Sequence, residues 1–461
     1  MDAEQIRQLK PMLTQYLKHF DGCFARKDTR AHLQVYVQGQ LSELRRKSVE
    51  PIAKEAGVPV RTLQEFLSLL KWDEERMRDR MQEMVAAEHP CPHAVGIIDE
   101  TSFAKQGHKT PGVKRQWCGS RGKKDNCTVT VHLAFAAADF HCLLDGELFL
   151  PQDWSDDRIR CRAAGIPDTM VYRPKWQIAL ELLDRARGNG IRLAWLTFDE
   201  GYGGKPPFLR ALRQRKQPFV GEVPRSFTGW IKPPRVTNRP FRRQRGRGRK
   251  TPRITSGSPP AQEVQHLLGH APQLRDQPWK PYYIRDGRQG PMVWEVKHVR
   301  FYLKDEGGLP ERRPMHLVIA RNVLKPGEIK FFVGDAPRGT QVGTLLLVAF
   351  SRWRVERCFE DHKDELGLDH YEGRCYLGLK RHLAISAVSY LFLSRVHEQW
   401  RGEKTGPHCL PGPHGGGQLG SLVVAPRPGF RQADPADRRE HPGNATRQRQ
   451  IRAEPHQAKT A

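Results

Sequence analysis

The sequence predicts an α/β protein: a mixed sheet with flanking helices, interrupted by a mostly β insertion and preceded by a helical domain. Apolar residues recur at helical spacing over residues 1–90, and strand-like and helical runs alternate over 91–223. Strand-like runs dominate residues 224–345, and residues 346–400 return to the central domain with helical spacing at 352–366 and 377–400. Residues 401–461 are rich in proline and glycine without a periodic apolar pattern, so we expect a disordered tail.

The charge of the chain favours a polyanionic partner. Lys and Arg number 77 against 51 Asp and Glu, a formal net charge of +26. Each phosphate that a protein neutralises releases counterions, so nucleic acid is the favoured partner. A membrane surface is disfavoured, because no amphipathic basic helix stands apart from the body.

Other compositional features exclude several classes of protein. No run approaches the roughly 18 apolar residues of a membrane span, and no signal peptide pattern opens the chain, so we expect a cytoplasmic protein. The nine cysteines form no CxxC pair, which indicates reduced thiols and neither a zinc ribbon nor a disulfide framework.

The helical N-terminal region contains a candidate helix-turn-helix over residues 49–67. A short helix runs through Ala53, Gly57 marks the turn, and a second helix carries Arg61, Thr62 and Gln64. These polar side chains suit a DNA-reading helix. An ordinary two-helix hairpin with a glycine turn has the same outline, so both interpretations stay open.

The central region alternates strands with helices. We expect strands at 94–99, 128–137, 143–150, 193–199 and 219–222, because their apolar residues run continuously or alternate with period two. Helical spacing predicts helices at 176–187 and 206–214. The first strands of this layer can be antiparallel.

The expected β insertion begins with a strongly basic stretch. Residues 224–262 contain no acid, and the 11 basic residues between Arg225 and Arg253 indicate a mobile arm that contacts DNA phosphates. Its densest part contains Arg242, Arg243, Arg245, Arg247, Arg249 and Lys250. Strand-like runs follow at 293–303, 316–320 and 330–333.

Three acids carry the candidate chemistry. Asp99 and Asp199 each end an apolar run that predicts a strand, and Glu356 lies in a predicted helix. Carboxylates are the ligands that Mg²⁺ and Mn²⁺ prefer, and two such ions roughly 4 Å apart catalyse phosphoryl transfer in many nucleases. Arg352 and Lys363 share a helix face with Glu356 and are placed to hold DNA phosphates.

Other roles remain open for these residues. Asp99 and Asp199 can cap a turn, and Arg352 with Glu356 can form an ordinary surface pair on a helix. Neighbouring acids can also replace the chosen ones. They are Glu100, Glu200, Glu360 and Asp361, of which Glu360 is the closest rival because it lies one turn beyond Glu356.

Four motifs resemble those of bacterial insertion-sequence transposases of the DDE superfamily, in the IS-four-like and IS-seven-oh-one-like groups. The similarity covers about residues 10–400. The motifs lie at residues 99–107 with 112–119 and 124–127, at 150–154 with 164–167 and 175–177, at 199–203, and at 352–363 with 366–374.

The resemblance implies an RNase H-like catalytic domain. In that family Asp99, Asp199 and Glu356 would be the metal ligands for two Mg²⁺ or Mn²⁺ ions, and Arg352 and Lys363 match the Arg and Lys of the Tyr-Arg-Glu-Lys signature. The implied partners are double-stranded DNA at the element's ends and target, and a second copy of the chain. No small-molecule cofactor and no membrane are expected, and the implied location is the nucleoid of a bacterial cytoplasm.

The sequence departs from the family in two places. Ala349 stands where the signature has its tyrosine, and the adjacent Phe350 has no hydroxyl. A Pro- and Gly-rich tail from about Gly406 replaces helical, Arg-rich sequence, and we hypothesise a shifted reading frame near residue 405. In relatives a tryptophan of the insertion stacks on a flipped base; Trp294 is the candidate here, with a core role as the alternative.

Three functions therefore compete. The first is a transposase that cleaves DNA at terminal inverted repeats and joins the freed end to target DNA. The second is a decayed copy that binds DNA without catalysis, which the altered tail favours. The third is a nuclease that cuts without strand transfer.

Overall fold

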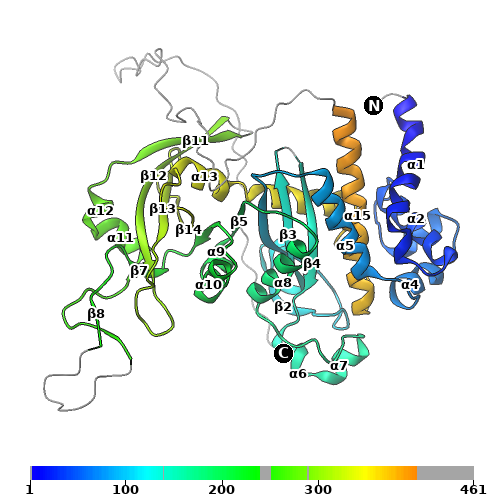
Figure 1. Ribbon diagram of the computed structural model, residues 1–461. Coiled ribbons are helices and arrows are strands. Elements are labelled where there is room, and N and C mark those ends of the chain that lie inside the picture. Colours follow the sequence, from blue (N-terminus) through cyan, green and yellow to red (C-terminus); the bar gives the residue numbers. More distant parts are fainter. Residues whose placement is uncertain (1–2, 139, 239–250, 288–289, 402–461) are drawn as a thin grey trace, which may run out of the picture. The chain divides into compact units, whose positions relative to one another are not determined.

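A computed structural model describes residues 3–138, 140–238, 251–287 and 290–401. The candidate basic arm at 242–250 and the tail from 402 lie outside the described residues. Most strands form one 12-stranded mixed sheet in the order β10-β7-β12-β13-β14-β6-β5-β1-β3-β2, with β11 beside β12 and β4 beside β3 (Figure 1). The α/β prediction is confirmed.

The strands, in chain order, are β1 (Val95–Ala104), β2 (Lys114–Cys118), β3 (Lys123–Ala137), β4 (Phe140–Leu148), β5 (Trp195–Phe198), β6 (Phe219–Val223), β7 (Thr228–Trp230), β8 (Val236–Thr237), β9 (Arg253–Ile254), β10 (Gln262–Glu263), β11 (Lys280–Gly287), β12 (Gly290–Leu303), β13 (Met315–Asn322) and β14 (Ile329–Asp335). β8 and β9 form a separate two-stranded sheet.

The helices are α1 (Ala3–Leu17), η1 (Lys18–Cys23), α2 (Lys27–Leu41), α3 (Val49–Glu55), α4 (Val60–Ser68), α5 (Glu74–Glu88), η2 (Gly119–Arg121), α6 (Gln152–Asp156), α7 (Arg158–Ala163), α8 (Lys175–Gly188), α9 (Glu200–Gly203), α10 (Pro206–Gln214), α11 (Val264–His270), α12 (Pro272–Arg275), α13 (Val342–Phe350), α14 (Trp353–Asp364) and α15 (Tyr376–Arg401). No helix of the described residues is long and apolar enough to cross a membrane.

The N-terminal helices pack around a shared apolar core. α3 and α4 are joined by a turn in which Gly57 has φ of +66°, a conformation that side chains disfavour. Ile52 of α3 and Leu63 and Phe66 of α4 are fully buried, and α4 also contacts α2 and α15. The two helices and turn expected from the sequence are therefore present, while their role in reading DNA stays a prediction.

Strand pairing at the centre of the sheet is mixed. β1 is antiparallel to β3 along its whole length, with Asp99 opposite His132. It is parallel to β5 over only four positions, which end where Ile98 faces Phe198. The prediction that the first strand ends at Asp99 is wrong, because β3 continues to pair with β1 as far as Ala104.

Helices cover both faces of this central region. α8 contacts β3 and β4, and its Lys175 pairs with Glu100, whereas α14 contacts β1, β3 and β4, and its preceding residue Arg352 pairs with Asp99. Asp99 and Glu100 are consecutive in a strand and point to opposite faces. α8 and α14 therefore lie on opposite faces, and the central strands are buried between them.

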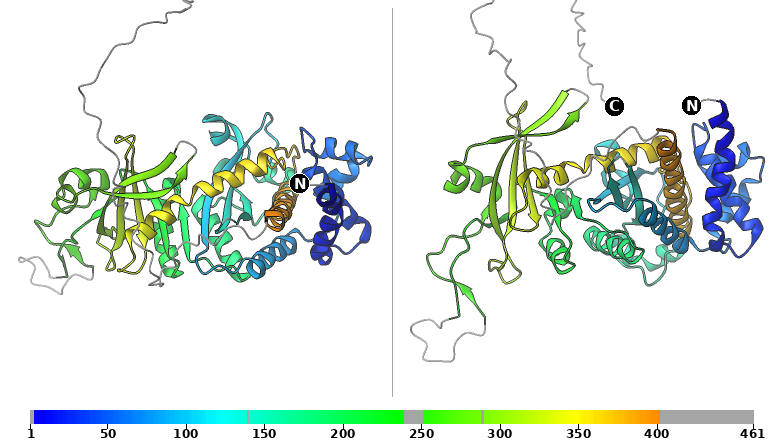
Figure 2. Two further views of the ribbon diagram at one scale, coloured as in Figure 1. Left: turned by 90° about the horizontal axis from the view of Figure 1, so that it is seen from above. Right: turned by 45° about the horizontal axis from the view of Figure 1, so that its top comes forward.

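The β insertion continues the central sheet. β14 pairs antiparallel with β6, so β13 and β12 extend the same sheet beyond the strands of the central region. Figure 2 shows α13 and α14 following each other across this sheet. α13 contacts β5, β6 and β13, and α14 contacts β1 and β3. The junction between the two helices thus lies over the boundary of β5 and β1.

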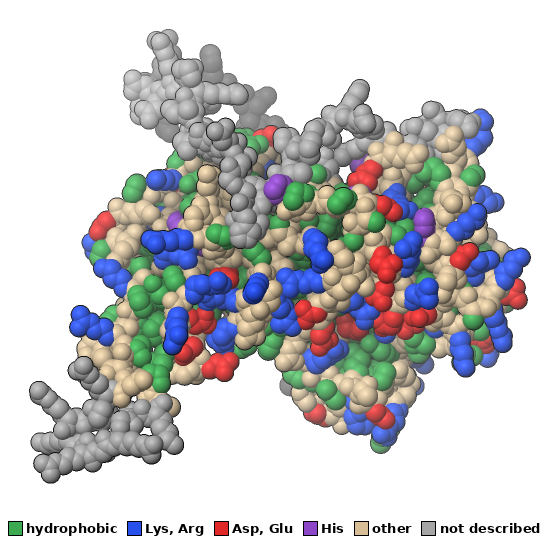
Figure 3. Space-filling model, viewed as in Figure 1, with side chains coloured by type: hydrophobic (Ala, Val, Ile, Leu, Met, Phe, Trp, Pro, Cys, Tyr) green, Lys and Arg blue, Asp and Glu red, His purple; other side chains and the backbone are tan. Residues whose placement is uncertain are grey.

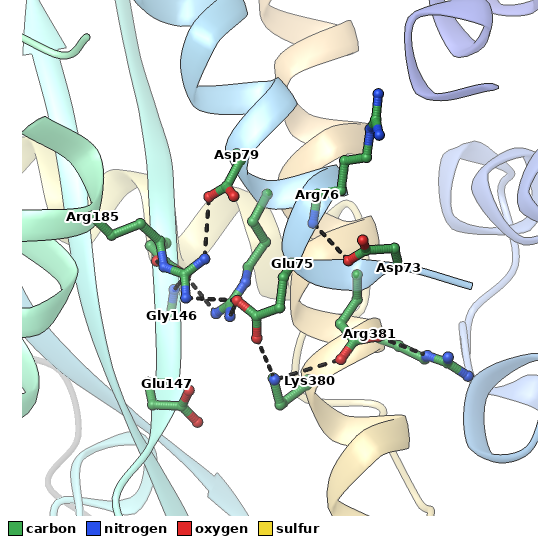
Figure 4. Close-up of polar contacts among 12 residues, drawn as sticks. Asp73, Glu75, Arg76, Asp79, Gly146, Glu147, Arg185, Lys380 and Arg381 are labelled. Atoms are coloured by element: carbon green, nitrogen blue, oxygen red, sulfur yellow. Dashed lines mark hydrogen bonds and ion pairs between the residues drawn. The ribbon is translucent and has the colours of Figure 1, made fainter. Parts of the chain in front are cut away.

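An ion-pair network, buried at its centre, joins α5 to the central sheet (Figure 4). Arg78 of α5 lies 2.8 Å from Asp145 of β4, and both side chains are buried. Glu75 pairs with Arg185 of α8 at 2.6 Å and with Lys380 of α15 at 2.5 Å. Buried charges are tolerated only when paired, so this network fixes α5 against three elements at once.

Candidate active site

Two carboxylates meet where β5 separates from β1. β1 carries Asp99, and Asp199 follows the last residue of β5. Because Ile98 and Phe198 are register partners in parallel strands, the residues that follow them begin on neighbouring strands about 5 Å apart. The Asp199 side chain caps α9 and accepts the backbone N–H of Gly201 at 3.0 Å. Asp199 therefore caps α9 and also lies beside Asp99 on the neighbouring strand.

Arg352 and Glu356 reach this point from the α13–α14 junction. The Arg352 Nη1 atom donates to Asp99 Oδ2 at 2.8 Å, and its Nη2 atom lies 2.9 Å from Glu356 Oε1. Asp99 and Glu356, although 257 positions apart in the chain, therefore bind one guanidinium. The rival acids Glu360 and Asp361 instead pair with Arg357.

The electrostatics of the site centre on Asp99. Burial raises the pKa of Asp99 to about 7, with Arg352 lowering it and the Asp199 carboxylate raising it again. The backbone N–H of Glu100 donates to its Oδ1 atom at 2.8 Å. Asp99 is therefore buried away from water, and a nearby cation is needed to stabilise its ionised form.

Arg352 supplies that positive charge in this structure. Burial alone lowers the pKa of Arg352, but Asp99, Glu356, Asp199 and Glu222 raise it above its ordinary value. Glu222 of β6 also pairs with Lys330 at 2.9 Å. The negative charges of four carboxylates thus stabilise one guanidinium. The site is therefore one that favours a bound cation.

A buried hydroxyl faces the same acids. The Tyr202 hydroxyl is buried and has no hydrogen-bond partner within the described structure. Burial and the charges of Glu100, Asp99 and Asp199 all raise its pKa well above the ordinary value. A buried hydroxyl without a hydrogen-bond partner lowers the free energy of unfolding by about 1–3 kcal/mol. The Tyr202 hydroxyl therefore destabilises the fold.

The donor set fits a hard divalent cation, although its members are not gathered around one point. Among the described residues no three His, Cys, Asp or Glu side chains form a ready metal cluster. Asp99, Asp199 and Glu356 nevertheless offer only carboxylate oxygens, the donors that Mg²⁺ and Mn²⁺ prefer. The cation held by Asp99 and Glu356 is the Arg352 guanidinium.

The predicted DNA-binding residues lie in different environments. Arg61 of α4 has an 84% exposed side chain and pairs with Glu65 at 2.7 Å. Lys363 of α14 is half-buried, and burial lowers its pKa. The run Arg242, Arg243, Arg245, Arg247, Arg249 and Lys250 lies outside the described residues.

Trp294 takes the core position that was the alternative to a base-stacking role. Its side chain is 4% exposed, and its ring centroid lies 4.9 Å from that of Phe350. β12 turns the indole toward α13, so the ring packs in the core and offers no free face to a base. The same contact places the side chain of Phe350, beside the signature position Ala349, in the core of the insertion.

Sequence reasoning missed two parts of this environment. Glu222 ends an expected strand, but only the parallel β5–β6 pairing brings that strand beside the site. Trp353, which opens α14, is partly exposed and stacks against Arg285 of β11 with the guanidinium carbon 4.3 Å from the ring centroid. β11 was not expected, so no sequence signal linked these two residues.

Comparison with known proteins adds a family match. A model of the DDE superfamily endonucleases matches residues 19–291, more than half of the chain, which includes Asp99 and Asp199 but ends before Glu356. A "probable transposase for insertion sequence element IS701" from Microchaete diplosiphon is 33% identical over 168 residues. That similarity spans 36% of this chain and 41% of the relative.

Proposed function

Because the chain belongs to the DDE superfamily endonucleases, we propose that it is a DNA transposase. It cleaves DNA at the terminal inverted repeats of a mobile element and transfers the freed 3′ end into target DNA. The observation that supports this most is the convergence of Asp99 and Asp199 at adjacent strands with Glu356, through Arg352. The similarity to the IS701 transposase points to the same activity.

Asp99, Asp199 and Glu356 are the residues that would hold the metal in this proposal. Enzymes of this superfamily generally use divalent metal ions, and two Mg²⁺ or Mn²⁺ ions fit the oxygen-only donor set. When bound, such ions activate the attacking water or hydroxyl and stabilise the leaving oxygen. Asp99 is kept dry by its burial and oriented by the N–H of Glu100.

Basic side chains would hold the DNA around these acids. Arg352 and Lys363 contact phosphates near the cleaved bond, Arg61 on α4 contributes to reading the terminal repeat, and residues 242–250 contact phosphates without reading sequence. Figure 3 shows Lys and Arg side chains spread over much of the visible face, with acids between them. Joining two element ends requires two active sites, so the working unit is a homodimer on DNA.

One observation favours the alternative of a decayed, non-catalytic copy. Ala349 replaces the tyrosine of the family signature, and its side chain is buried in α13. No hydroxyl is therefore supplied from this position to a phosphate. A nuclease without strand transfer is the remaining alternative and is separated by the same experiment.

The test is incubation of the full chain with DNA carrying the terminal repeats and Mg²⁺. The wild type is expected to cleave and to join ends to a target plasmid, Asp99→Asn to do neither, and Glu360→Gln to behave as wild type because Glu360 pairs with Arg357. Cleavage without joining identifies a nuclease, and binding alone a decayed copy. Cleavage by Asp99→Asn at the wild-type rate refutes the assignment of the site.

A further inference from the structure

A basic hairpin extends beyond the end of β1, the strand that carries Asp99. It comprises residues 114–125, in which β2, η2 and the start of β3 contain five basic residues and one acid. Lys114 pairs with Asp153 and Arg121 with Asp125. Arg115, Lys123 and Lys124 are exposed and form no ion pair with any described residue. The basic hairpin therefore has uncompensated positive charge.

Trp117 lies among these basic side chains. Its side chain is 60% exposed, the highest value of any aromatic residue in the part of the chain that the structure describes. Lys124 is its register partner on β3, and Arg115 precedes it by two residues on β2. Side chains alternate between the faces of a strand, so Arg115, Trp117 and Lys124 lie on one face of the basic hairpin.

The opposite face anchors the basic hairpin to β1. Cys118 is fully buried, with its Sγ atom 3.6 Å from Ser102 Oγ, and the Ser120 N–H donates to the same Ser102 oxygen at 3.4 Å. Ser102 follows Asp99 by three residues on β1, a separation of about 10 Å along a strand. Trp117 is thus presented to solvent by a ribbon that is anchored on β1, the strand that carries Asp99.

We propose that the basic hairpin binds unpaired DNA bases, with one base stacked on Trp117 and adjacent phosphates neutralised by Arg115 and Lys124, which share its face. Exposed aromatic rings within a positive groove bind single strands with little sequence preference, because every base has a π-face. Charge complementarity favours nucleic acid over a second protein, since Arg115 and Lys124 beside Trp117 form no ion pair with a described acid. The inference rests on the proposed function, in which a strand end freed near Asp99 supplies the unpaired bases.

Binding of a short fluorescein-labelled single strand of mixed sequence, measured by anisotropy in EDTA, tests this role. Trp117→Ala is expected to weaken binding by about tenfold, the loss of one stacked base, whereas Trp117→Phe retains most of it. Ile159→Ala is the matched control, because Ile159 on α7 is 80% exposed and apolar. Lys124→Gln is expected to reduce the slope of log Kd against log salt concentration by about 1, the value for one lost phosphate contact.

Several outcomes overturn the inference. It fails if Trp117→Ala binds the single strand as tightly as wild type, or if Ile159→Ala loses as much affinity. It also fails if Trp117→Ala lowers the oligomeric mass in light scattering with DNA binding unchanged, because the surface then serves a second copy of the chain. Asp99→Asn is expected to bind as wild type in EDTA, so loss of cleavage and loss of single-strand binding are separate results.

Discussion

Substitution of Asp99 by Asn is expected to stabilise the metal-free protein at alkaline pH. Burial raises the pKa of Asp99 from 3.8 to about 7. A carboxyl whose folded pKa exceeds its unfolded pKa contributes stability while it is protonated, and that contribution is lost as pH rises through the folded pKa. Ionised Asp99 therefore opposes folding in the absence of metal.

The magnitude follows from the two pKa values. A rise from 3.8 to about 7 corresponds to about 4 kcal/mol between the acid and alkaline limits. Between about pH 5 and about pH 8 the wild type loses roughly 3 kcal/mol of this, and Asp99→Asn loses none of it. The difference in unfolding free energy between variant and wild type should increase by that amount over this range.

The assay is urea unfolding in EDTA, followed by circular dichroism at several pH values. Glu360→Gln is the control, since it removes an acid from α14 that pairs with Arg357 outside the Asp99 cluster. A difference between Asp99→Asn and wild type that stays constant with pH refutes the reasoning. So does an equal pH dependence for Glu360→Gln.

Three further predictions concern other parts of the structure. Tyr202→Phe removes an unpaired buried hydroxyl and is expected to leave the urea midpoint unchanged or raised, whereas a loss above about 1 kcal/mol shows that the hydroxyl is hydrogen-bonded. Arg78→Met leaves Asp145 buried with one close partner removed and is expected to cost about 3–5 kcal/mol, of which the double variant with Asp145→Leu recovers most; equal destabilisation by both variants contradicts the network of Figure 4. Lys363→Gln is expected to weaken duplex binding at all sequences and to reduce its salt dependence by about one contact, and an unchanged salt dependence places Lys363 off the DNA.

Much of the central fold was predictable because its elements have clear periodicity. The alternation of apolar residues in β3 and the spacing in α8 and α15 predicted those elements. The apolar runs before Asp99 and Asp199 also predicted that both acids lie at the sheet. Their adjacency depends on the parallel pairing of β1 with β5, which a linear pattern does not specify.

The elements that were missed have weak or ambiguous patterns. α13 is apolar on every side, and a short continuous apolar run cannot be assigned to helix or strand by periodicity. β2 begins with two charged residues and is mostly exposed, so its pairing with β3 gives no apolar alternation. The joining of β14 to β6 arises from tertiary pairing between strands far apart in the chain.

In the candidate site, too, local contacts were predictable from the sequence and contacts between distant segments were not. The spacing of Arg352 and Glu356 predicted their contact, since residues four apart on a helix are neighbours. The bond from Arg352 to Asp99 joins distant segments and required the structure. The burial of Trp294 depends on which face of β12 meets α13, which the sequence left open.

The central claim is that Asp99, Asp199 and Glu356 form one metal site, and titration calorimetry with Mn²⁺ tests it most directly. Wild type and Glu360→Gln are expected to bind Mn²⁺ alike, while Asp99→Asn, Asp199→Asn and Glu356→Gln each lose most of the affinity. Undiminished Mn²⁺ binding by all three variants would contradict the claim.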